Sequence, residues 1–361
     1  MRCFRIRFRL VSSLGTPFQA DTIFGHICWA VRYLEGEEAL QAFLAAYRDV
    51  PPLLVSDGFP VVGDLFYLPR PTLPAGPHQF EAVAESAGVA ANDRPARREF
   101  AAAWKALEKK PYFELEALVA RANPLDWADI ARDCFALQIC PQSMAARDEV
   151  VCACGDWRKC PALDTEAESV KCEIAYPDQP AAVTMHNVIN RHTMASINLY
   201  AREDLFPSHG IYFLAQIDDR VMTECRLRAC LNYICGSGFG RDKSTGCGAM
   251  KDLVVEEWAP PSVAGANAFL NLSSAYVPAA GELPRGFYTT HVKRGKLGGH
   301  YVLQHSPWKR PVLMIRAGAV FEGDPTAVYG GLVANVHYEL DQVVQYGYAY
   351  PLGVKLDAEA L

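Results

Sequence analysis

The chain has 361 residues, of which half are hydrophobic and about a fifth are charged, and its formal net charge at pH 7 is -6. This length suits one large globular domain or two medium ones. No segment is apolar for long enough to span a bilayer, and the N-terminal MRCFRIRFRL lacks the uninterrupted apolar run of a secretory signal, so we expect a cytoplasmic protein without membrane contacts. The net acidity alone would disfavour nucleic-acid binding, but the positive charge is clustered at Arg2–Arg9, Arg241–Lys243, His291–Lys296 and Lys309–Arg310.

The first 47 residues predict one strand and two helices. Residues 3–11 alternate arginines with apolar side chains, which is typical of a half-buried strand. After a loop, Asp21 or Thr22 is expected to cap a helix that continues to Leu34, with His26 in its first turn. A second helix is expected over residues 37–47.

The following residues, up to 258, complete a ferredoxin-like or RRM-like fold of the order βαββαβ, interrupted after its first helix. Residues 51–77 predict extended segments separated by prolines and glycines, residues 80–133 have a helical pattern, and residues 145–180 are polar enough for an exposed insertion. The order is completed by strands at 183–190 and 210–217, a helix at 222–235, a glycine-rich turn, and a strand at 251–258.

The remaining residues predict a second, smaller module made mostly of strands. Its strands are expected at 268–277, 287–292, 300–304, 311–321 and 343–351. The predicted fold class is therefore α+β, with an N-terminal domain at 1–258 and a C-terminal domain at 259–361. The insertion in the first domain is placed at about 50–180, with its cysteine-containing part at 134–172.

The glycine-rich turn is the strongest local signal for a binding site. It reads GSGFGRDKSTGCG from Gly236 to Gly248. Glycines permit positive φ, so that consecutive backbone N–H groups can converge on an anion, and Arg241 to Thr245 add two cations and two hydroxyl groups. This combination suits the phosphates of a nucleic acid better than a purely structural turn. A nucleotide P-loop is disfavoured because it would run from a strand into a helix, the reverse of the order predicted here.

Two further segments are candidates for contacts with phosphates or bases. Gly15–His26 contains a helix N-terminus, whose free N–H groups attract phosphate, and His26 could act as a general base, although a lone histidine more often packs against its neighbours. Asn190-Arg191-His192 ends a predicted strand, where a guanidinium and an imidazole can stack on unpaired bases. The alternative for this second segment is an ordinary surface turn.

Four cysteines lie together in the polar insertion: Cys152, Cys154, Cys160 and Cys172. Four thiolates could complete a tetrahedral zinc site that holds a loop without a core of its own. However, the Cys-x-Cys spacing is tighter than in a usual zinc knuckle, and no second knuckle follows. A structural zinc ion is thus an option rather than a requirement, and no other cofactor is expected.

Six segments occur in a fixed order along the chain: SLGTPFQADTIFGHICWAVRYLEG, SDGFPVVGDLFYLPRP, HNVINRHT, GFGRDKSTGCG, RAGAVFEG and VQYGYAYPLGV. In this order they resemble the RAMP subunit that caps type III-A (Csm) CRISPR effector complexes. The glycine-rich segment alone is shared by many RAMP proteins, whereas the first and last segments together point to the Csm-type cap subunit. The region of about 75–180 resembles no family segment.

The resemblance implies two ferredoxin-like modules, the second degenerate, in a non-catalytic subunit of an antiviral defence complex. Such subunits bind the repeat-derived 5′ tag of the CRISPR RNA, dock on the large polymerase/HD subunit, and start the row of backbone RAMP subunits. The family pattern requires no metal at the cysteine-rich insertion. Carried over residue by residue, the resemblance implies RNA contacts at Gly15, Thr16, Gln19, Thr22, His26, Asn190, Arg191, His192, Gly238, Phe239, Gly240, Arg241, Lys243, Ser244 and Thr245.

Three other functions stay open at this point. The chain could be a RAMP endoribonuclease that processes CRISPR RNA with His26 as general base, a nucleotide-binding protein, or an adaptor without RNA contacts. If the main reading holds, Phe239, His26 or Arg191 could stack on bases of the tag. Charge reversal at both Arg241 and Lys243 would then weaken RNA retention and leave the fold intact.

Overall fold

A computed structural model describes residues 1–122, 124–136, 139–140, 144, 177, 180–207, 209–276, 283–304 and 306–357. Its central element is an antiparallel sheet with the strand order β5-β4-β3-β8-β1-β9, in which β2 also pairs with β8. The strands are β1 (Arg2–Leu10), β2 (Leu53–Val55), β3 (Phe59–Val62), β4 (Leu65–Pro69), β5 (Tyr112–Glu114), β8 (Gly210–Ile217) and β9 (Met250–Glu257).

The alternation in β1 separates a buried face from an arginine face, as the sequence predicts. The apolar side chains of the strand form part of the main core: Phe4, Ile6, Phe8 and Leu10. On the other face, Arg5 binds Glu256 at 2.7 Å and Arg9 binds Asp252 at 2.9 Å, both across the ladder to β9. These arginines therefore hold the sheet together and do not form a free basic surface.

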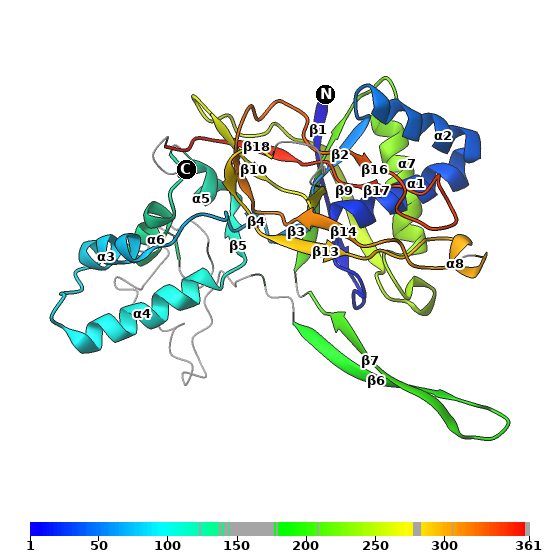
Figure 1. The fold of residues 1–361 in the computed structure, drawn as a ribbon, viewed down its shortest axis with the longest axis horizontal. Coiled ribbons are helices and arrows are strands. Elements are labelled where there is room, and N and C mark those ends of the chain that lie inside the picture. The colour runs from blue at the N-terminus through cyan, green and yellow to red at the C-terminus, as the bar shows by residue number, and fades with distance from the viewer. Residues whose placement is uncertain are drawn as a thin grey trace.

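Three helices form a group beside the central sheet, in which the first and third contact its strands and the second packs against the first (Figure 1). They are α1 (Ala20–Glu35), α2 (Glu37–Ala45), which continues as a short 3-10 helix (Ala46–Arg48), and α7 (Glu224–Ser237). Helix α1 begins two or three residues earlier than expected, so that its N-cap is Gln19 and His26 lies in its second turn. Neither Asp21 nor Thr22 is the cap.

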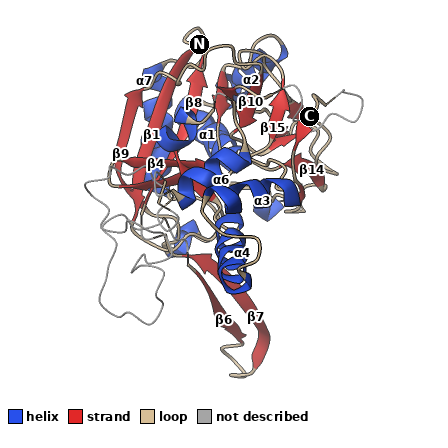
Figure 2. Ribbon diagram, turned by 90° about the vertical axis from the view of Figure 1, so that its left-hand side faces the viewer, coloured by secondary structure: helices blue, strands red, loops and turns tan. Residues whose placement is uncertain are grey.

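The expected strand at 183–190 exists, but it does not belong to the central sheet. It is β6 (Ala181–Ile189), and among the described residues its one partner strand is β7 (Ser196–Leu205), which the sequence did not reveal. The place beside β8 is taken by β2 and β3, from the region expected to begin an insertion. The β6–β7 hairpin projects from the body of the molecule, and both of its faces are largely exposed (Figures 1 and 2).

A helical lobe, formed by residues 77–135, lies at the β5 end of the sheet (Figure 1). Its helices are α3 (Pro77–Ser86), α4 (Arg94–Glu108), α5 (Leu115–Ala120) and α6 (Trp127–Phe135). The lobe is held by contacts among aromatic rings, such as Phe100 on Phe135 at 4.7 Å and Phe113 on Trp127 at 5.9 Å. The helical pattern of 80–133 is confirmed for these four helices, but the sequence did not reveal strand β5, which lies within this range.

The C-terminal part consists of small antiparallel sheets with the orders β12-β15-β10-β18, β11-β14-β13 and β16-β17. Their strands are β10 (Ala268–Asn271), β11 (Ala275–Tyr276), β12 (Gly286–Phe287), β13 (Thr290–Lys293), β14 (Val312–Ile315), β15 (Val320–Glu322), β16 (Leu332–Val333), β17 (Gln345–Tyr346) and β18 (Pro351–Val354). The expected strand at 300–304 is wrong, because this segment forms the short helix α8 (Tyr301–Gln304).

Within the ranges that the structure describes, no helix has the length and apolar character needed to cross a bilayer. The helices and sheets given above make the described chain a mixed α/β protein with antiparallel sheets. The expected boundary between two domains near residue 259 stays a prediction.

Candidate nucleic-acid interface

The glycine-rich turn connects α7 to β9 and begins after Ser237, because Gly236 is still helical. Four of its glycines have positive φ, from 67° to 95°: Gly238, Gly240, Gly246 and Gly248. Two of these positions also leave no room for a side chain. A Cβ atom on Gly248 would lie 2.0 Å from the carbonyl oxygen of Phe239, and one on Gly240 would lie 2.9 Å from Cβ of Thr16.

Most backbone N–H groups of the turn donate to acceptors within the protein, either in the turn itself or in segments beside it. Phe239 donates to the carbonyl of Gly248 at 3.0 Å, and Gly248 donates to the carbonyl of Ser13 at 2.8 Å. The N–H of Gly240 donates to Nε2 of His26, and that of Arg241 donates to the hydroxyl of Thr16 at 3.1 Å. The expectation that the whole run converges on an anion is therefore wrong.

Three consecutive N–H groups remain, those of Asp242, Lys243 and Ser244. Within the described residues they donate to no acceptor. Asp242 has a left-handed backbone conformation, and the 3-10 helix Lys243–Thr245 begins directly after it. All three residues are exposed, and Thr245 donates its hydroxyl hydrogen to the carbonyl of Asp242 at 2.8 Å. Consecutive free N–H groups of this kind can bind an anion.

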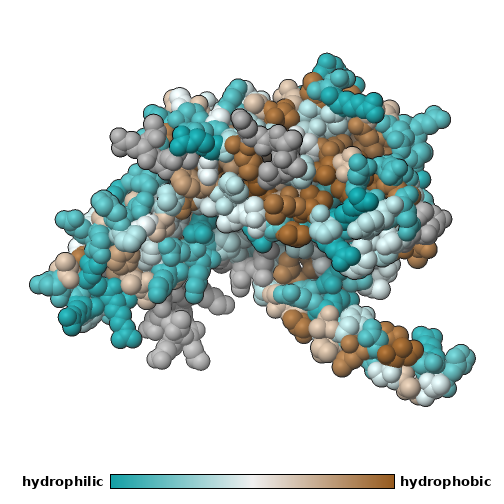
Figure 3. Space-filling view, in the orientation of Figure 1, coloured by the Kyte–Doolittle hydropathy of each residue, from teal (hydrophilic) through white to brown (hydrophobic). Residues whose placement is uncertain are grey.

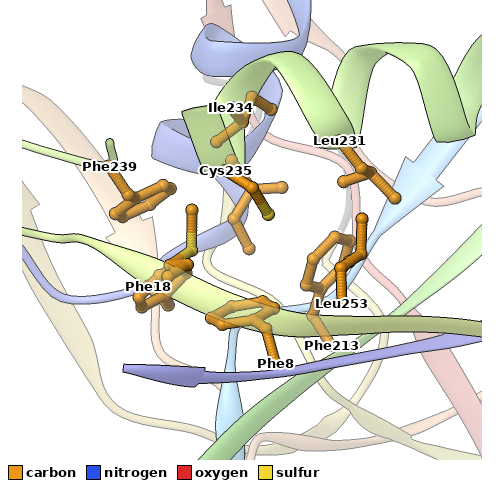
Figure 4. A pocket seen from close by; sticks show the side chains of 10 residues that line it. Phe8, Phe18, Phe213, Leu231, Ile234, Cys235, Phe239 and Leu253 are labelled. Atoms are coloured by element: carbon orange, nitrogen blue, oxygen red, sulfur yellow. The ribbon is translucent and has the colours of Figure 1, made fainter. Parts of the chain in front are cut away.

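Phe239 is a core residue, which contradicts the expectation that its ring stacks on a base. The ring is 2% exposed and lies 3.8 Å from the ring of Phe18 in a nearly parallel stack. It lines an apolar cavity of about 20 Å³ between α7 and the sheet, together with Phe8 and Ile234 (Figure 4). That volume holds no more than about one water molecule, so a base has no space there.

His26 also contacts the ring of Phe239. Its ring is stacked on Phe239 at 4.5 Å, and its Nε2 atom accepts the hydrogen bond from Gly240 at 2.9 Å. Burial, and to a smaller extent the nearby charge of Lys243, lower the pKa of His26 to about 3. The imidazole is thus neutral near pH 7, with its Nε2 lone pair engaged, which opposes its use as a general base or as a base-stacking platform.

Arg241 binds neighbouring parts of the chain. Its Nε donates to the carbonyl of Gly15 at 2.5 Å, and its NH2 group donates to the carbonyl of Glu203 and to the carboxylate of Asp204, the latter at 3.1 Å. Asp204 is only 2% exposed. Arg241 therefore joins the glycine-rich turn to the first loop and to the base of the hairpin. The expectation that its charge reversal leaves the fold intact conflicts with these contacts.

Lys243 contrasts with Arg241, because no carboxylate pairs with it in the described part of the chain. Partial burial lowers its pKa from the ordinary value, although the residue is exposed at the surface. Its ammonium group and the hydroxyl of Ser244 are the exposed polar side-chain donors of the turn, whereas the carboxylate of Asp242 pairs with Arg202 at 3.7 Å.

The expectation that the N-terminus of α1 is open to a phosphate is wrong, because a carboxylate of the protein already lies there. The carboxylate of Asp57 accepts the N–H of Ala20 at 2.8 Å, and it also accepts the N–H and the hydroxyl of Ser274 at 2.9 and 3.0 Å. A carboxylate at this position takes the place of an external anion. Nearby, Gln19 contacts Lys293 and Ser274, and Thr22 donates its hydroxyl hydrogen to Asp21 at 3.4 Å.

The Asn190-Arg191-His192 segment forms the tip of the β6–β7 hairpin. The side-chain oxygen of Asn190 accepts the N–H of His192 at 2.9 Å and that of Thr193 at 3.3 Å, which fixes the turn. Arg191 and His192 are exposed there. Arg241 of the glycine-rich turn contacts Glu203 and Asp204 at the opposite end of β7, and the tip projects from the body of the molecule (Figures 1 and 2), so the structure does not bring it together with the other predicted segments.

The base of the hairpin does meet the predicted site. Leu14 and Leu205 form a reciprocal pair of backbone hydrogen bonds of 2.8 and 2.9 Å, which places the hairpin base beside Gly15. The sequence reasoning missed Glu203 and Asp204, the partners of Arg241. The run Arg202-Glu203-Asp204 at the end of a strand was the available signal for an ion-pair cluster.

Cys152, Cys154, Cys160 and Cys172 lie outside the described residues, so the option of a structural zinc ion stays a prediction. In the ranges that the structure covers, no cluster of histidine, cysteine or acidic side chains has an arrangement suited to a metal ion.

Comparison with solved structures shows a similar fold over nearly the whole chain. The Csm4 chain of the Csm3-Csm4 subcomplex in a type III-A CRISPR-Cas interference complex matches with a TM-score of 0.59 and 14% identity, covering 99% of this chain and 100% of that one. The Csm4 chain of a Csm1-Csm4 cassette in complex with cA4 matches with a TM-score of 0.53 and 17% identity, covering 99% of each chain. No family model matches the sequence, and no curated protein matches it. The chain therefore has the fold of the Csm-type RAMP subunits of type III-A CRISPR complexes.

Proposed function

We propose that this chain is a non-catalytic, RNA-binding subunit of a type III-A CRISPR effector complex that acts in antiviral defence and holds the 5′ tag of the CRISPR RNA. The observation that carries the proposal is the fold agreement with Csm4 chains along 99% of the sequence. In RNA-guided complexes, base pairing supplies sequence specificity, so a subunit at the end of the guide only has to fix that end and set the register.

The RNA contact is proposed at the exposed turn Asp242–Ser244. Three free N–H groups, the ammonium group of Lys243 and the hydroxyl of Ser244 all belong to this one short segment. Amide, hydroxyl and ammonium donors suit a phosphodiester, and none of them reads a base. Gly15, Thr16, Gly240 and Arg241 would then act by shaping and positioning this turn, because their polar groups are used within the protein.

The partners are proposed to be the large polymerase/HD subunit and the backbone RAMP subunits. The similar structures are a Csm1-Csm4 cassette and a Csm3-Csm4 subcomplex, and a chain with the same fold can present equivalent surfaces. The β6–β7 hairpin supports an assembly role, because its apolar side chains are interleaved with polar ones and left exposed (Figure 3). They are Val183, Met185, Val188, Ile189, Ile197, Leu199 and Tyr200, with exposures from 44% to 65%. A free two-stranded hairpin is marginally stable in water, so contact with a partner would stabilise it.

Isolation of the chain from its native host with an affinity tag tests this proposal. We expect small RNAs that share a repeat-derived 5′ end, together with one large and one repeated smaller protein. Recovery of the proteins without RNA would instead favour the adaptor. Cleavage of repeat RNA by the pure chain, lost in His26→Ala, would favour the endoribonuclease.

A further inference from the structure

A second exposed group of cations lies in the C-terminal part of the chain, on residues that are not part of the turn Asp242–Ser244. Strands β13 and β14 remain paired beyond their ends, because the N–H of Leu297 donates to the carbonyl of Pro307 at 2.8 Å and the N–H of Lys309 donates to that of Gly295 at 2.9 Å. The register shifts by one residue on the way, from Lys293 opposite Val312 to Lys296 opposite Trp308. We call the surface formed by Arg294, Lys296, Trp308, Arg310 and Tyr338 the basic-aromatic face.

The register shift decides which side chains share this face. Side chains alternate along a strand, so a shift by one residue exchanges the inward and outward positions. Leu297 and Lys309 point inward, and Lys309 donates from Nζ to the carbonyl of Val344 at 2.8 Å and to the side chain of Gln345 at 3.1 Å. Arg294, Lys296, Trp308 and Arg310 are exposed on the opposite side.

Tyr338 extends the face from a third segment of the chain. The N–H of Arg310 donates to the carbonyl of Val336 at 2.7 Å, which places the segment around Tyr338 beside the segment that contains Trp308 and Arg310. The neighbouring His337 is buried, and its imidazole bonds to the carbonyl of Ser306 at 2.8 Å and accepts the N–H of Glu339 at 3.1 Å. These bonds anchor the backbone on both sides of Tyr338, whose own side chain is 70% exposed.

Each cation of the face lies over an exposed ring. Nζ of Lys296 is 4.3 Å and the guanidinium of Arg294 is 5.1 Å from the ring centre of Trp308, and the guanidinium of Arg310 is 4.4 Å from that of Tyr338. None of the three cations pairs with a carboxylate among the described residues. This differs from the arginine face of β1, whose cations are neutralised across the ladder.

We propose that the basic-aromatic face binds single-stranded nucleic acid without sequence preference. Unpaired cations can neutralise phosphates, and exposed aromatic rings offer a stacking surface that accepts any base. An acidic protein segment would need only the charges, so the two exposed rings favour nucleic acid. The inference goes beyond the proposed function, because it does not require the turn Asp242–Ser244 to hold RNA.

The face is connected to the region of the turn through α1. Gly298 and Gly299 pack against the indole of Trp29, where a Cβ atom on either glycine would lie within 2.6 Å of the ring. Trp29 lies nearly one helical turn after His26, which contacts Gly240. A single strand of nucleic acid bound at the turn Asp242–Ser244 could therefore continue along α1 toward the basic-aromatic face.

Binding of a short labelled oligouridylate to the full-length chain, followed by fluorescence anisotropy over a range of salt concentrations, tests the inference. We expect the triple variant Arg294→Glu, Lys296→Glu, Arg310→Glu to bind at least about ten-fold more weakly, with the slope of log affinity against log salt reduced by roughly 2 for three lost phosphate contacts. The matched control is Arg94→Glu, Arg98→Glu, Lys105→Glu, which makes the same charge change on the exposed side of α4. The control should keep most of the affinity and the slope.

Two single substitutions, Trp308→Ala and Tyr338→Ala, separate stacking from charge. Each should weaken binding by roughly five-fold or more and leave the salt slope unchanged. Thermal unfolding of every variant checks that the fold is retained.

Equal binding by the triple variant and its control would overturn the inference. So would binding of polyglutamate with the same dependence on all five residues, which would mark the face as a docking site for an acidic protein. Lys243→Glu is measured in parallel: loss of binding there, with none in the triple variant, overturns this inference and leaves the proposed function standing. Loss in the triple variant and none in Lys243→Glu supports the face alone.

Discussion

His26 and Gly240 are joined by a hydrogen bond of 2.9 Å, in which the backbone N–H of the glycine donates to Nε2 of the imidazole. The bond connects the second turn of α1 to the glycine-rich turn, and it requires a neutral ring that carries its hydrogen on Nδ1. Protonation of His26 would remove the acceptor and place a charge in a largely buried site.

The stability of the protein should therefore depend on pH through His26. The pKa of His26 is lowered to about 3 in the folded protein, so the unfolded chain binds more protons between pH 3 and about 6.5. The wild type should thus lose stability relative to His26→Gln as the pH falls through this window, by at most about 5 kcal/mol. Urea unfolding at several pH values measures this, with His78→Gln on the exposed side of α3 as the control. A constant difference between wild type and His26→Gln would contradict the assigned role.

Arg241 and Lys243 should behave differently although both are cations of one turn. Arg241→Ala removes the bonds to Gly15 and to the buried Asp204, and should cost about 1–2 kcal/mol of the free energy of unfolding. Lys243→Ala removes an exposed, unpaired group and should change it by less than about 0.5 kcal/mol. Denaturant unfolding of the two variants compares these effects, and equal destabilisation would show that Lys243 also has a structural partner.

Asp57 connects α1 to the C-terminal part and should also make stability depend on pH. Burial raises its pKa to about 6, so the folded protein binds more protons than the unfolded chain between about pH 4 and 6. The carboxyl group of Asp57 therefore stabilises the fold most at low pH, where it is protonated, and its contribution falls as the pH rises through 6. Asn at this position can accept both N–H groups with its oxygen and donate to Ser274.

Asp57→Asn should accordingly gain stability relative to wild type as the pH rises from 4 to 7, by up to about 3 kcal/mol. Asp64→Asn, which changes a fully exposed carboxylate, serves as the control. Asp57 makes the protein less stable as the pH rises, whereas His26 makes it less stable as the pH falls. The stability of each variant must therefore be measured as a difference from wild type at the same pH. A variant that is less stable than wild type by a constant amount at every pH would sink this account of Asp57.

Gly236 and Gly248 of the glycine-rich segment provide a test of how closely the backbone of the turn approaches itself. Gly248→Ala would force a Cβ atom onto the carbonyl of Phe239 and should destabilise the protein by more than about 2 kcal/mol. Gly236→Ala lies within α7 with open space around it, and should stabilise the helix by about 0.5–1 kcal/mol. Thermal unfolding of the pair decides the matter, and similar melting temperatures would contradict the described turn.

The sequence allowed the elements with regular patterns to be predicted. The alternation of residues 3–11 and the apolar stripe of α1 come from burial on one side, which leaves a period in the sequence. Strand β7 has no such period, because both of its faces are largely exposed. Strands β2 and β3 are short and fully buried at most positions, so that their role in the central sheet was hidden among prolines and glycines.

The glycine-rich segment forms a turn between α7 and β9, as predicted, but the contacts of its residues could not be read from the sequence. The bond between Arg241 and Gly15 joins positions 226 residues apart, and that between Gly240 and His26 joins positions 214 apart. A glycine-rich turn with free N–H groups and one whose N–H groups are bonded internally have the same composition. Only the tertiary contacts show that Phe239 and Arg241 face the protein and that Lys243 faces solvent.

The amount of guide RNA that stays with the assembled complex, compared between the wild type and Lys243→Glu, tests the central claim most directly. Arg98→Glu provides the same charge change far from the turn, on α4 (Figure 1). If the turn Asp242–Ser244 clasps the sugar-phosphate chain, Lys243→Glu should retain several-fold less RNA after a salt wash, while the proteins still assemble and melt at an unchanged temperature. Retention equal to that of Arg98→Glu would show that the guide is held elsewhere.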